Sequence, residues 1–113
     1  DVDAAMEAMK PYSSDVEKHI SPEMVMKQVA QLFDLKVSDL RSKGRSKEIA
    51  VPRQIAMYLC DQMTQLSLAE IGKKFGGRNH STVIHACKKI QKEAKPGTDL
   101  SNKLDLLQNM LKN

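Results

Sequence analysis

The chain has 113 residues and a formal net charge of +4, with 41% hydrophobic but only 4% aromatic residues. This length allows one small domain, and a core of Leu, Ile, Val, Met and Ala side chains favours packed helices over a sheet. No apolar run approaches the roughly 20 residues of a membrane span, and no segment resembles a signal peptide, so nothing indicates a membrane-spanning or secreted protein.

Charge is distributed unevenly along the chain. Residues 1–35 hold three basic and seven acidic side chains, for a net charge of −4. Residues 36–95 hold thirteen basic and five acidic side chains, for +8, and the remaining tail is neutral. A positive segment beside an acidic leader indicates that the middle segment binds a polyanion. Ordinary solvated lysines would give the same total, so the function has to be inferred from motifs.

The first 20 residues are expected to precede the main domain. Residues 2–10 have an amphipathic pattern that predicts a short helix, which Pro11 ends. The residues that follow read as a linker. Because the chain begins with Asp1 rather than Met, we expect it to be a fragment of a longer protein. The main domain is then predicted over residues 21–113.

Two helical segments open the main domain. Ser21 can cap a helix and Pro22 suits its first turn, which predicts a helix over residues 22–33. A single helical turn is predicted over residues 37–40.

A basic loop and a long helix come next. Residues 41–50, RSKGRSKEIA, are expected to form a loop that Gly44 keeps flexible. The helix is predicted over about residues 50–65, with Pro52 in its first turn. Its core stripe consists of apolar residues at helical spacing: Ile55, Ala56, Leu59, Cys60 and Met63.

The most informative stretch is residues 67–90, SLAEIGKKFGGRNHSTVIHACKKI. Ser67 and Glu70 match a capping box at a helix start. The inward face of this helix is formed by Leu68, Ile71 and Phe75. Glycine accepts the left-handed backbone of a C-terminal cap, so Gly76 and Gly77 are predicted to end the helix.

A second helix is predicted to begin after Asn79, which can cap it. Its inward face would consist of Val83, Ala86, Cys87 and Ile90. The side chains left outside carry hydroxyls, imidazoles and positive charges but no acid: Arg78, Ser81, Thr82, His85, Lys88, Lys89 and Lys92. A compact two-helix corner with such a second helix is suited to insertion into a DNA major groove.

Residues 94–97, AKPG, break the chain, and a last helix is predicted over residues 98–111. Together these elements predict an all-α fold of about six helices around one core. Its centre would be a helix-turn-helix with an extra long helix before it.

The run FGGRNHSTVIHACKKI resembles the signature of the C-terminal DNA-binding domain (domain IV) of the bacterial chromosomal replication initiator family, DnaA. The resemblance extends upstream through residues 43–60, KGRSKEIAVPRQIAMYLC, and more loosely through residues 24–33. Two separate motifs at the right mutual distance make the match more specific than a general helix-turn-helix pattern. The first 20 residues would then be the tail of an upstream ATPase region and a linker helix.

The resemblance also implies roles for individual residues. Asn79 and His80 would read bases, Ser81 would touch a base methyl, and Arg45 would enter the minor groove, where a narrow A·T-rich groove attracts an arginine. Arg53 and Gln54, at the start of their helix, would hold a phosphate. The complete predicted DNA-binding set is Lys43, Arg45, Lys47, Arg53, Gln54, Leu68, Ala69, Arg78, Asn79, His80, Ser81, Thr82, His85, Lys88 and Lys89.

The sequence departs from the family pattern at four positions. Asn79 stands where the family usually has Asp; its side-chain oxygen could still accept from a cytosine amino group, while its amide nitrogen could also donate. Ser81 replaces a usual Thr and lacks the methyl that would pack on thymine. Ala69 replaces a common Pro, and Asp61 occupies a position that is often basic.

Other chemistries do not fit the sequence. His80, His85, Cys60 and Cys87 lack the paired spacing of a zinc site, and both cysteines are interpreted as buried reduced thiols of a cytoplasmic protein. No phosphate-binding loop of the GxxxxGK[ST] type and no catalytic set is present. We therefore predict a protein that is not an enzyme and needs no cofactor, although the resemblance implies ATP binding by the longer parent.

The predicted function is sequence-specific binding of duplex DNA. By resemblance, the targets would be the short, asymmetric DnaA boxes at a bacterial replication origin, bound by a monomeric domain in the nucleoid, with oligomerisation on DNA left to the full-length protein. One alternative is a dimeric transcriptional regulator with a palindromic operator, but no free dimerisation helix is evident. Another is a module that docks an acidic protein. Contact with acidic phospholipids has only weak support, because the joint before residue 21 is acidic.

Overall fold

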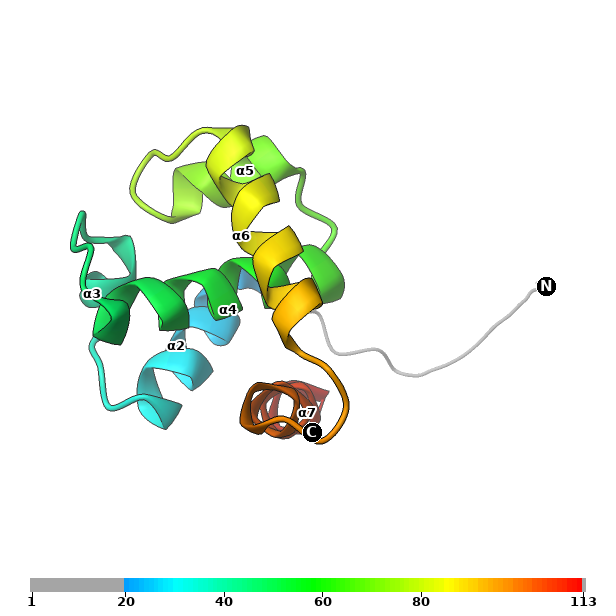
Figure 1. The fold of residues 1–113 in the computed structure, drawn as a ribbon. Helices are drawn as coiled ribbons and strands as arrows, with labels where there is room; N and C mark the ends of the chain where they lie inside the picture. The colour runs from blue at the N-terminus through cyan, green and yellow to red at the C-terminus, as the bar shows by residue number, and fades with distance from the viewer. Residues whose placement is uncertain (1–19, 113) are drawn as a thin grey trace, which may run out of the picture.

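The computed structural model describes residues 20–112, and within them the chain is entirely helical, as predicted (Figure 1). The helix predicted over residues 2–10 and its linker lie outside the described residues. In chain order the elements are α2 (Pro22–Leu32), α3 (Val37–Arg41), α4 (Lys47–Met63), α5 (Leu68–Lys74), α6 (His80–Glu93) and α7 (Asp99–Lys112).

Polar side chains start the first two helices, and the cap at Ser21 was predicted. The Ser21 hydroxyl accepts a hydrogen bond from the Met24 backbone N–H at 3.1 Å, which caps α2. At α3 the Asp39 carboxylate accepts from the Lys36 backbone N–H at 2.9 Å. Both helices thereby satisfy backbone donors that have no partner inside the helix.

Helix α4 begins at Lys47, about one turn before the predicted start at residue 50. The prediction placed Pro52 in the first turn, where proline is most favourable, but Pro52 lies inside the helix and is buried. The added turn packs toward the preceding loop, because a β-carbon at Gly44 would stand 3.2 Å from Ile49 Cδ1. The loop is therefore short, covering residues 42–46 instead of the predicted 41–50.

Helix α4 lies at the centre of the fold (Figure 1). It packs against α2 and α3 on one side and against α5 and α6 on the other. Four residues of its predicted core stripe, Ile55, Ala56, Leu59 and Cys60, have no exposed surface, and the fifth, Met63, is partly buried against the core. Burial of apolar side chains from both sides makes α4 the platform on which the helix-turn-helix is mounted.

The helix-turn-helix follows the prediction closely. Ser67 and Glu70 form the capping box, with reciprocal bonds of 2.9 and 3.1 Å between side chains and backbone N–H groups. Gly76 and Gly77 end α5 with φ angles of +85° and +80°. Gly72 was not singled out, yet the Arg78 N–H donates to its carbonyl at 2.9 Å. A β-carbon on Gly72 would clash with the Arg78 carbonyl oxygen.

Helix α7 packs against α2. Its Leu104, Leu107 and Leu111 are buried, and Leu100 is partly buried against the core. The Lys103 ammonium lies 5.2 Å from the centre of the Phe33 ring, a cation–π contact between the two helices. No helix in residues 20–112 combines the length and apolar character required of a membrane span.

The two cysteines differ in burial. Cys60 is completely buried, as predicted, whereas Cys87 is only half-buried. Burial raises the pKa of the Cys60 thiol to about 12 and that of Cys87 to about 11. Both thiols are therefore protonated near neutral pH and are poor nucleophiles.

We expect Gly72→Ala to destabilise the domain more than Gly77→Ala. The new methyl group at position 72 meets backbone, which cannot rotate away, so we expect a loss of about 2–4 kcal/mol in the free energy of unfolding. At Gly77 the space is open, and only the positive φ opposes alanine, at about 1–2 kcal/mol. Urea denaturation of both variants measures the difference. Equal losses would show that the turn does not depend on this close approach.

Candidate nucleic-acid interface

Helix α6 presents a continuous polar face. Val83 and Ile90 are fully buried and Ala86 is nearly so, and these three residues hold the helix on the core. The α6 residues of the predicted DNA-binding set lie away from this buried face and are all exposed: His80, Ser81, Thr82, His85, Lys88 and Lys89. The single acid of the helix, Glu93, is its last residue. The face toward solvent therefore offers donors and acceptors at the N-terminal end of the helix and positive charge in its second half.

Asn79 is the cap of α6, as predicted, and this use limits what its side chain can offer to DNA. Its oxygen accepts from the Thr82 backbone N–H at 3.0 Å and from the Thr82 hydroxyl at 3.2 Å. The oxygen was expected to remain available to a cytosine amino group. With both hydrogen bonds made inside the helix, the amide N–H groups are what remains for an outside partner.

Two further predicted residues begin α5. Leu68 is half-buried and packs on the core, while Ala69 is exposed. Helix α5 packs against α6, so the start of the helix-turn-helix contributes a small apolar surface beside the polar face of α6.

The basic residues before α4 are exposed but do not share one element. Lys43 and Arg45 lie in the loop, on either side of Gly44, whereas Lys47 is the first residue of α4. Lys47 was predicted as part of the loop. The earlier helix start changes this, so the loop carries two cations of the predicted three.

Arg53 is a buried residue, with 7% of its surface exposed. The prediction placed it at the start of its helix, but it lies in the second turn of α4. Its Nε donates to the Leu40 carbonyl at 3.2 Å, and its Nη2 donates to the carbonyls of Ser42 at 3.0 Å and Gly44 at 2.8 Å. Burial and the nearby charge of Arg78 lower the pKa of Arg53.

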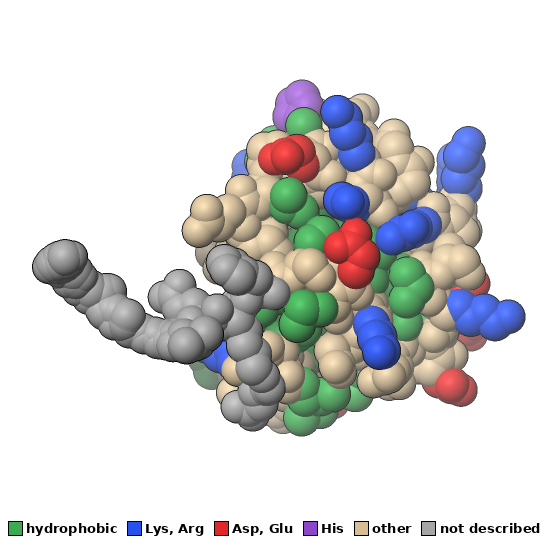
Figure 2. All heavy atoms as spheres, turned by 180° about the vertical axis from the view of Figure 1, so that it is seen from behind, with side chains coloured by type: hydrophobic (Ala, Val, Ile, Leu, Met, Phe, Trp, Pro, Cys, Tyr) green, Lys and Arg blue, Asp and Glu red, His purple; other side chains and the backbone are tan. Residues whose placement is uncertain are grey.

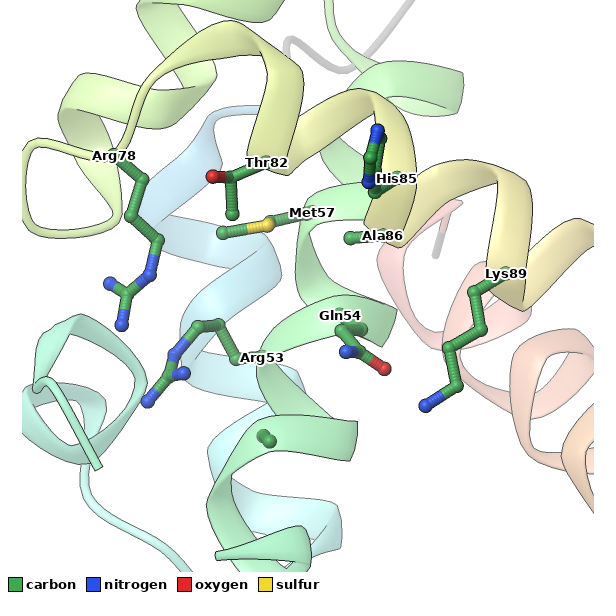
Figure 3. A pocket seen from close by; sticks show the side chains of 9 residues that line it. Arg53, Gln54, Met57, Arg78, Thr82, His85, Ala86 and Lys89 are labelled. Atoms are coloured by element: carbon green, nitrogen blue, oxygen red, sulfur yellow. The ribbon is translucent and has the colours of Figure 1, made fainter. Parts of the chain in front are cut away.

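Arg78, predicted to point outward, is half-buried and turned back toward the same loop. Its Nη2 donates to the Ser42 carbonyl at 2.7 Å, and its Nη1 donates to the Phe75 carbonyl. Burial lowers the pKa of this guanidinium as well. Figure 3 shows the side chains of Arg53 and Arg78 pointing to one side of the hollow, away from Lys89.

Two hollows lie between these elements. One, of about 270 Å³, separates the first half of α4 from α6; its polar lining consists of Arg53, Gln54, Arg78, Thr82, His85 and Lys89 (Figure 3). The Gln54 side-chain oxygen is buried there without a hydrogen-bond partner. The other hollow, of about 370 Å³, contains Lys43, Arg45, Arg53 and Arg78. Neither is lined by an acid, so both suit an anion.

The reverse face of the molecule is different. Figure 2 shows acidic and basic side chains mixed there, with separate small hydrophobic areas between them. One exposed pair on the structure joins Glu23 to Lys74 at 3.3 Å. Mixed charge of this kind attracts a polyanion less than the surface around the two hollows, which are lined by cations and by no acid.

Comparison with known proteins identifies the family. The family model described as "Bacterial dnaA protein helix-turn-helix" matches residues 22–90, more than half of the chain. The chain belongs to the bacterial DnaA helix-turn-helix family. The matched DnaA region is a helix-turn-helix domain and is not catalytic.

Individual relatives agree with this assignment. The chain is 46% identical over 98% of its length to the chromosomal replication initiator protein DnaA of Leptothrix cholodnii, and 45% identical over 94% to that of Geobacter sulfurreducens. It spans 22% and 24% of those two proteins. A crystal structure of a "DNA replication initiation factor" is 32% identical to this chain and superposes with a TM-score of 0.72. The match covers 80% of this chain and 27% of the chain in that structure.

The structure brings most of the predicted set onto one surface and leaves its contacts with DNA as predictions. It adds three features that the sequence analysis did not identify: the close approach at Gly72, the carbonyl of Ser42 as a shared acceptor, and the inward course of Arg78. Only Gly72 carried a usable signal, because a glycine inside a helical pattern often marks close backbone contact.

We expect Arg53→Met to destabilise the domain by about 2–4 kcal/mol, because three carbonyl oxygens lose a charged donor in a buried position. Lys89→Met is the matched control, since it also replaces a cation by an apolar side chain but at an exposed position, and it should cost under about 0.5 kcal/mol. Thermal and urea unfolding measure both. A small loss in Arg53→Met would mean that solvent replaces the guanidinium without cost.

Proposed function

We propose that this domain binds duplex DNA with α6 in the major groove and Arg45 of the loop in the adjacent minor groove. The observation that carries the proposal is the exposed polar face of α6, with His80, Ser81 and Thr82 in its first turn and no acid before Glu93. Recognition helices of this class meet base edges with their N-terminal residues.

The surroundings of α6 support the same orientation. Lys89 lies further along the helix, and Gln54 faces it across the hollow from α4 (Figure 3). A DNA backbone at the edge of the groove would lie against Lys89 and Gln54. Contacts of such groups with phosphates position a duplex without reading its sequence. Lys43 and Lys47 extend the positive surface toward the minor groove.

The family supports a more specific target. The relatives named above are chromosomal replication initiator proteins, so we infer that the sites are DnaA boxes at a replication origin and that the domain serves the initiation of chromosome replication in the cytoplasm. Binding as a monomer to asymmetric sites, with ATP binding and oligomerisation in a longer protein, belongs to the same proposal. Contact with acidic phospholipids gains no support from the positive charge of this surface alone.

The clearest test contrasts His80→Ala with Lys89→Ala. Loss of a base contact should weaken binding to the specific site by roughly 1–3 kcal/mol and change binding to scrambled DNA little. Loss of a phosphate contact should weaken both duplexes about equally and reduce the salt slope by roughly one unit. We expect the first behaviour for His80, at the start of α6, and the second for Lys89.

Titration of both variants against specific and scrambled duplexes at several salt concentrations gives the result. A random-duplex selection on the wild-type domain supplies the specific site. Equal weakening of both duplexes by His80→Ala would contradict the placement of the α6 start against base edges. Weak binding to every duplex, with no base preference, would point instead to docking of an acidic protein.

Asn79→Asp should change the base preference at one position. Aspartate caps a helix as well as asparagine does, so the stability should stay within about 0.5 kcal/mol. One carboxylate oxygen would replace the capping oxygen, and the other would accept a hydrogen bond in place of the amide donor. We expect a gain for cytosine, whose amino group faces the major groove, of roughly 1–3 kcal/mol.

Random-duplex selection with the wild type and with Asn79→Asp measures this shift. Ser81→Thr is the matched control, because it restores a second family residue without changing any charge or the cap. An unchanged preference at every position in Asn79→Asp would show that residue 79 caps α6 without facing a base.

A further inference from the structure

The carbonyl oxygen of Ser42 accepts hydrogen bonds from two arginines on different elements. Arg53 Nη2 reaches it from α4 at 3.0 Å, and Arg78 Nη2 reaches it from the turn before α6 at 2.7 Å. The two guanidinium groups repel each other, yet both are held at one oxygen. Partial negative charge on the carbonyls of Leu40, Gly44 and Phe75, which accept from the same two side chains, offsets this repulsion.

The loop also touches the glycine turn through its backbone. A β-carbon at Gly76 would clash with the carbonyl oxygen of Arg41, so the turn and the start of the loop are in direct contact. The residues that end α3, carry the loop and connect α5 to α6 therefore meet at one place. These contacts therefore fix the position of the loop relative to α6.

The loop makes few hydrogen bonds of its own. The Ser42 hydroxyl donates to the Asp39 carbonyl at 2.7 Å and accepts from the Gly44 N–H at 3.3 Å. The carbonyls of Ser42 and Gly44, in contrast, point to the guanidinium groups. A short segment with a central glycine needs such external bonds to keep one conformation, because ordering each residue costs about 1–2 kcal/mol of backbone entropy.

We propose that Arg53 and Arg78 are positioning residues that clamp the loop and hold Arg45 at a set distance from α6. The inference rests on the proposed function, in which Arg45 lies in the minor groove. Arg78 then affects DNA recognition through the loop, because its guanidinium is directed into the protein. The clamp makes the minor-groove and major-groove contacts parts of one rigid surface.

The clamp differs from a phosphate contact in what it requires of the side chain. Both Nη atoms of Arg78 are used, one for Phe75 and one for Ser42, so two acceptors are bridged by one planar group. Lysine keeps the positive charge but cannot bridge two acceptors in the same fork geometry. Arg78→Lys should therefore preserve attraction to phosphate and lose the clamp.

The first measurement needs no DNA. Backbone ¹⁵N order parameters of residues 43–46 are compared in the wild type, Arg78→Lys, Arg78→Met and the control Lys95→Met, an exposed cation outside the proposed interface. We expect values near about 0.85 in the wild type and control, falling below about 0.6 in both Arg78 variants. Order parameters across α4 and α6 report whether each variant is folded. Unchanged order in residues 43–46 of a folded Arg78→Lys would overturn the proposal.

The second measurement uses the duplex from the random selection and a copy in which the A·T pairs at the minor-groove end are replaced by G·C. The ratio of the two affinities measures the A·T preference, and Arg45→Ala should reduce it by about tenfold. We expect Arg78→Lys to lose most of the same preference, and Arg45→Ala/Arg78→Lys to lose no more than Arg45→Ala alone. Such non-additivity shows that Arg78 acts through Arg45.

The opposite pattern is equally clear. If Arg78→Lys keeps the preference while Arg78→Met weakens both duplexes equally and lowers the salt slope by about one unit, Arg78 is a phosphate ligand and the proposal is wrong. If the wild type itself shows no A·T preference, the proposed minor-groove contact fails. The order parameters then still decide whether the clamp exists.

Discussion

The close approach of the Arg78 backbone to Gly72 determines how the helix-turn-helix and the proposed interface are arranged. The Arg78 N–H donates to the Gly72 carbonyl at 2.9 Å, and no side chain fits between the two segments. This contact sets where the chain leaves the turn, and therefore the angle between α5 and α6 and the direction of the Arg78 side chain. Because both partners are backbone atoms, no side chain can rotate to accommodate a substitution here. The geometry of this contact therefore determines the geometry of the interface.

Two features determine the charge of the proposed interface: no acid lines the two hollows, and backbone carbonyls accept from the buried arginines. The cations of the loop and α6 line two hollows that contain no acidic side chain. This arrangement favours binding of a polyanion. The two inward arginines are satisfied by backbone oxygens instead of carboxylates. Neutral acceptors leave the net positive charge of the surface intact, whereas buried acids would have cancelled it while performing the same structural task.

Much of this arrangement could be predicted from the sequence, because its signals are local. Capping residues such as Ser67 and Asn79 and the apolar stripes of α4 and α6 depend on spacing alone, and the structure confirms them. The start of α4 could not be found in the same way, since packing against the loop outweighed the usual place of Pro52. The inward course of Arg53 and Arg78 depends on the carbonyls of Ser42 and Gly44, which are 9 to 36 residues away and for which sequence spacing gives no indication.

Asn79 joins stability and recognition in one side chain, since its oxygen closes the first turn of α6 at the surface proposed to face DNA. Only a few residue types cap a helix well, chiefly Ser, Thr, Asp and Asn. Substitutions at this position that keep the domain folded therefore come from a small chemical alphabet. Base preference at this position can change in evolution between hydrogen-bond donors and acceptors among these residue types. Large or apolar side chains are excluded because they do not cap α6, whatever their effect on DNA recognition.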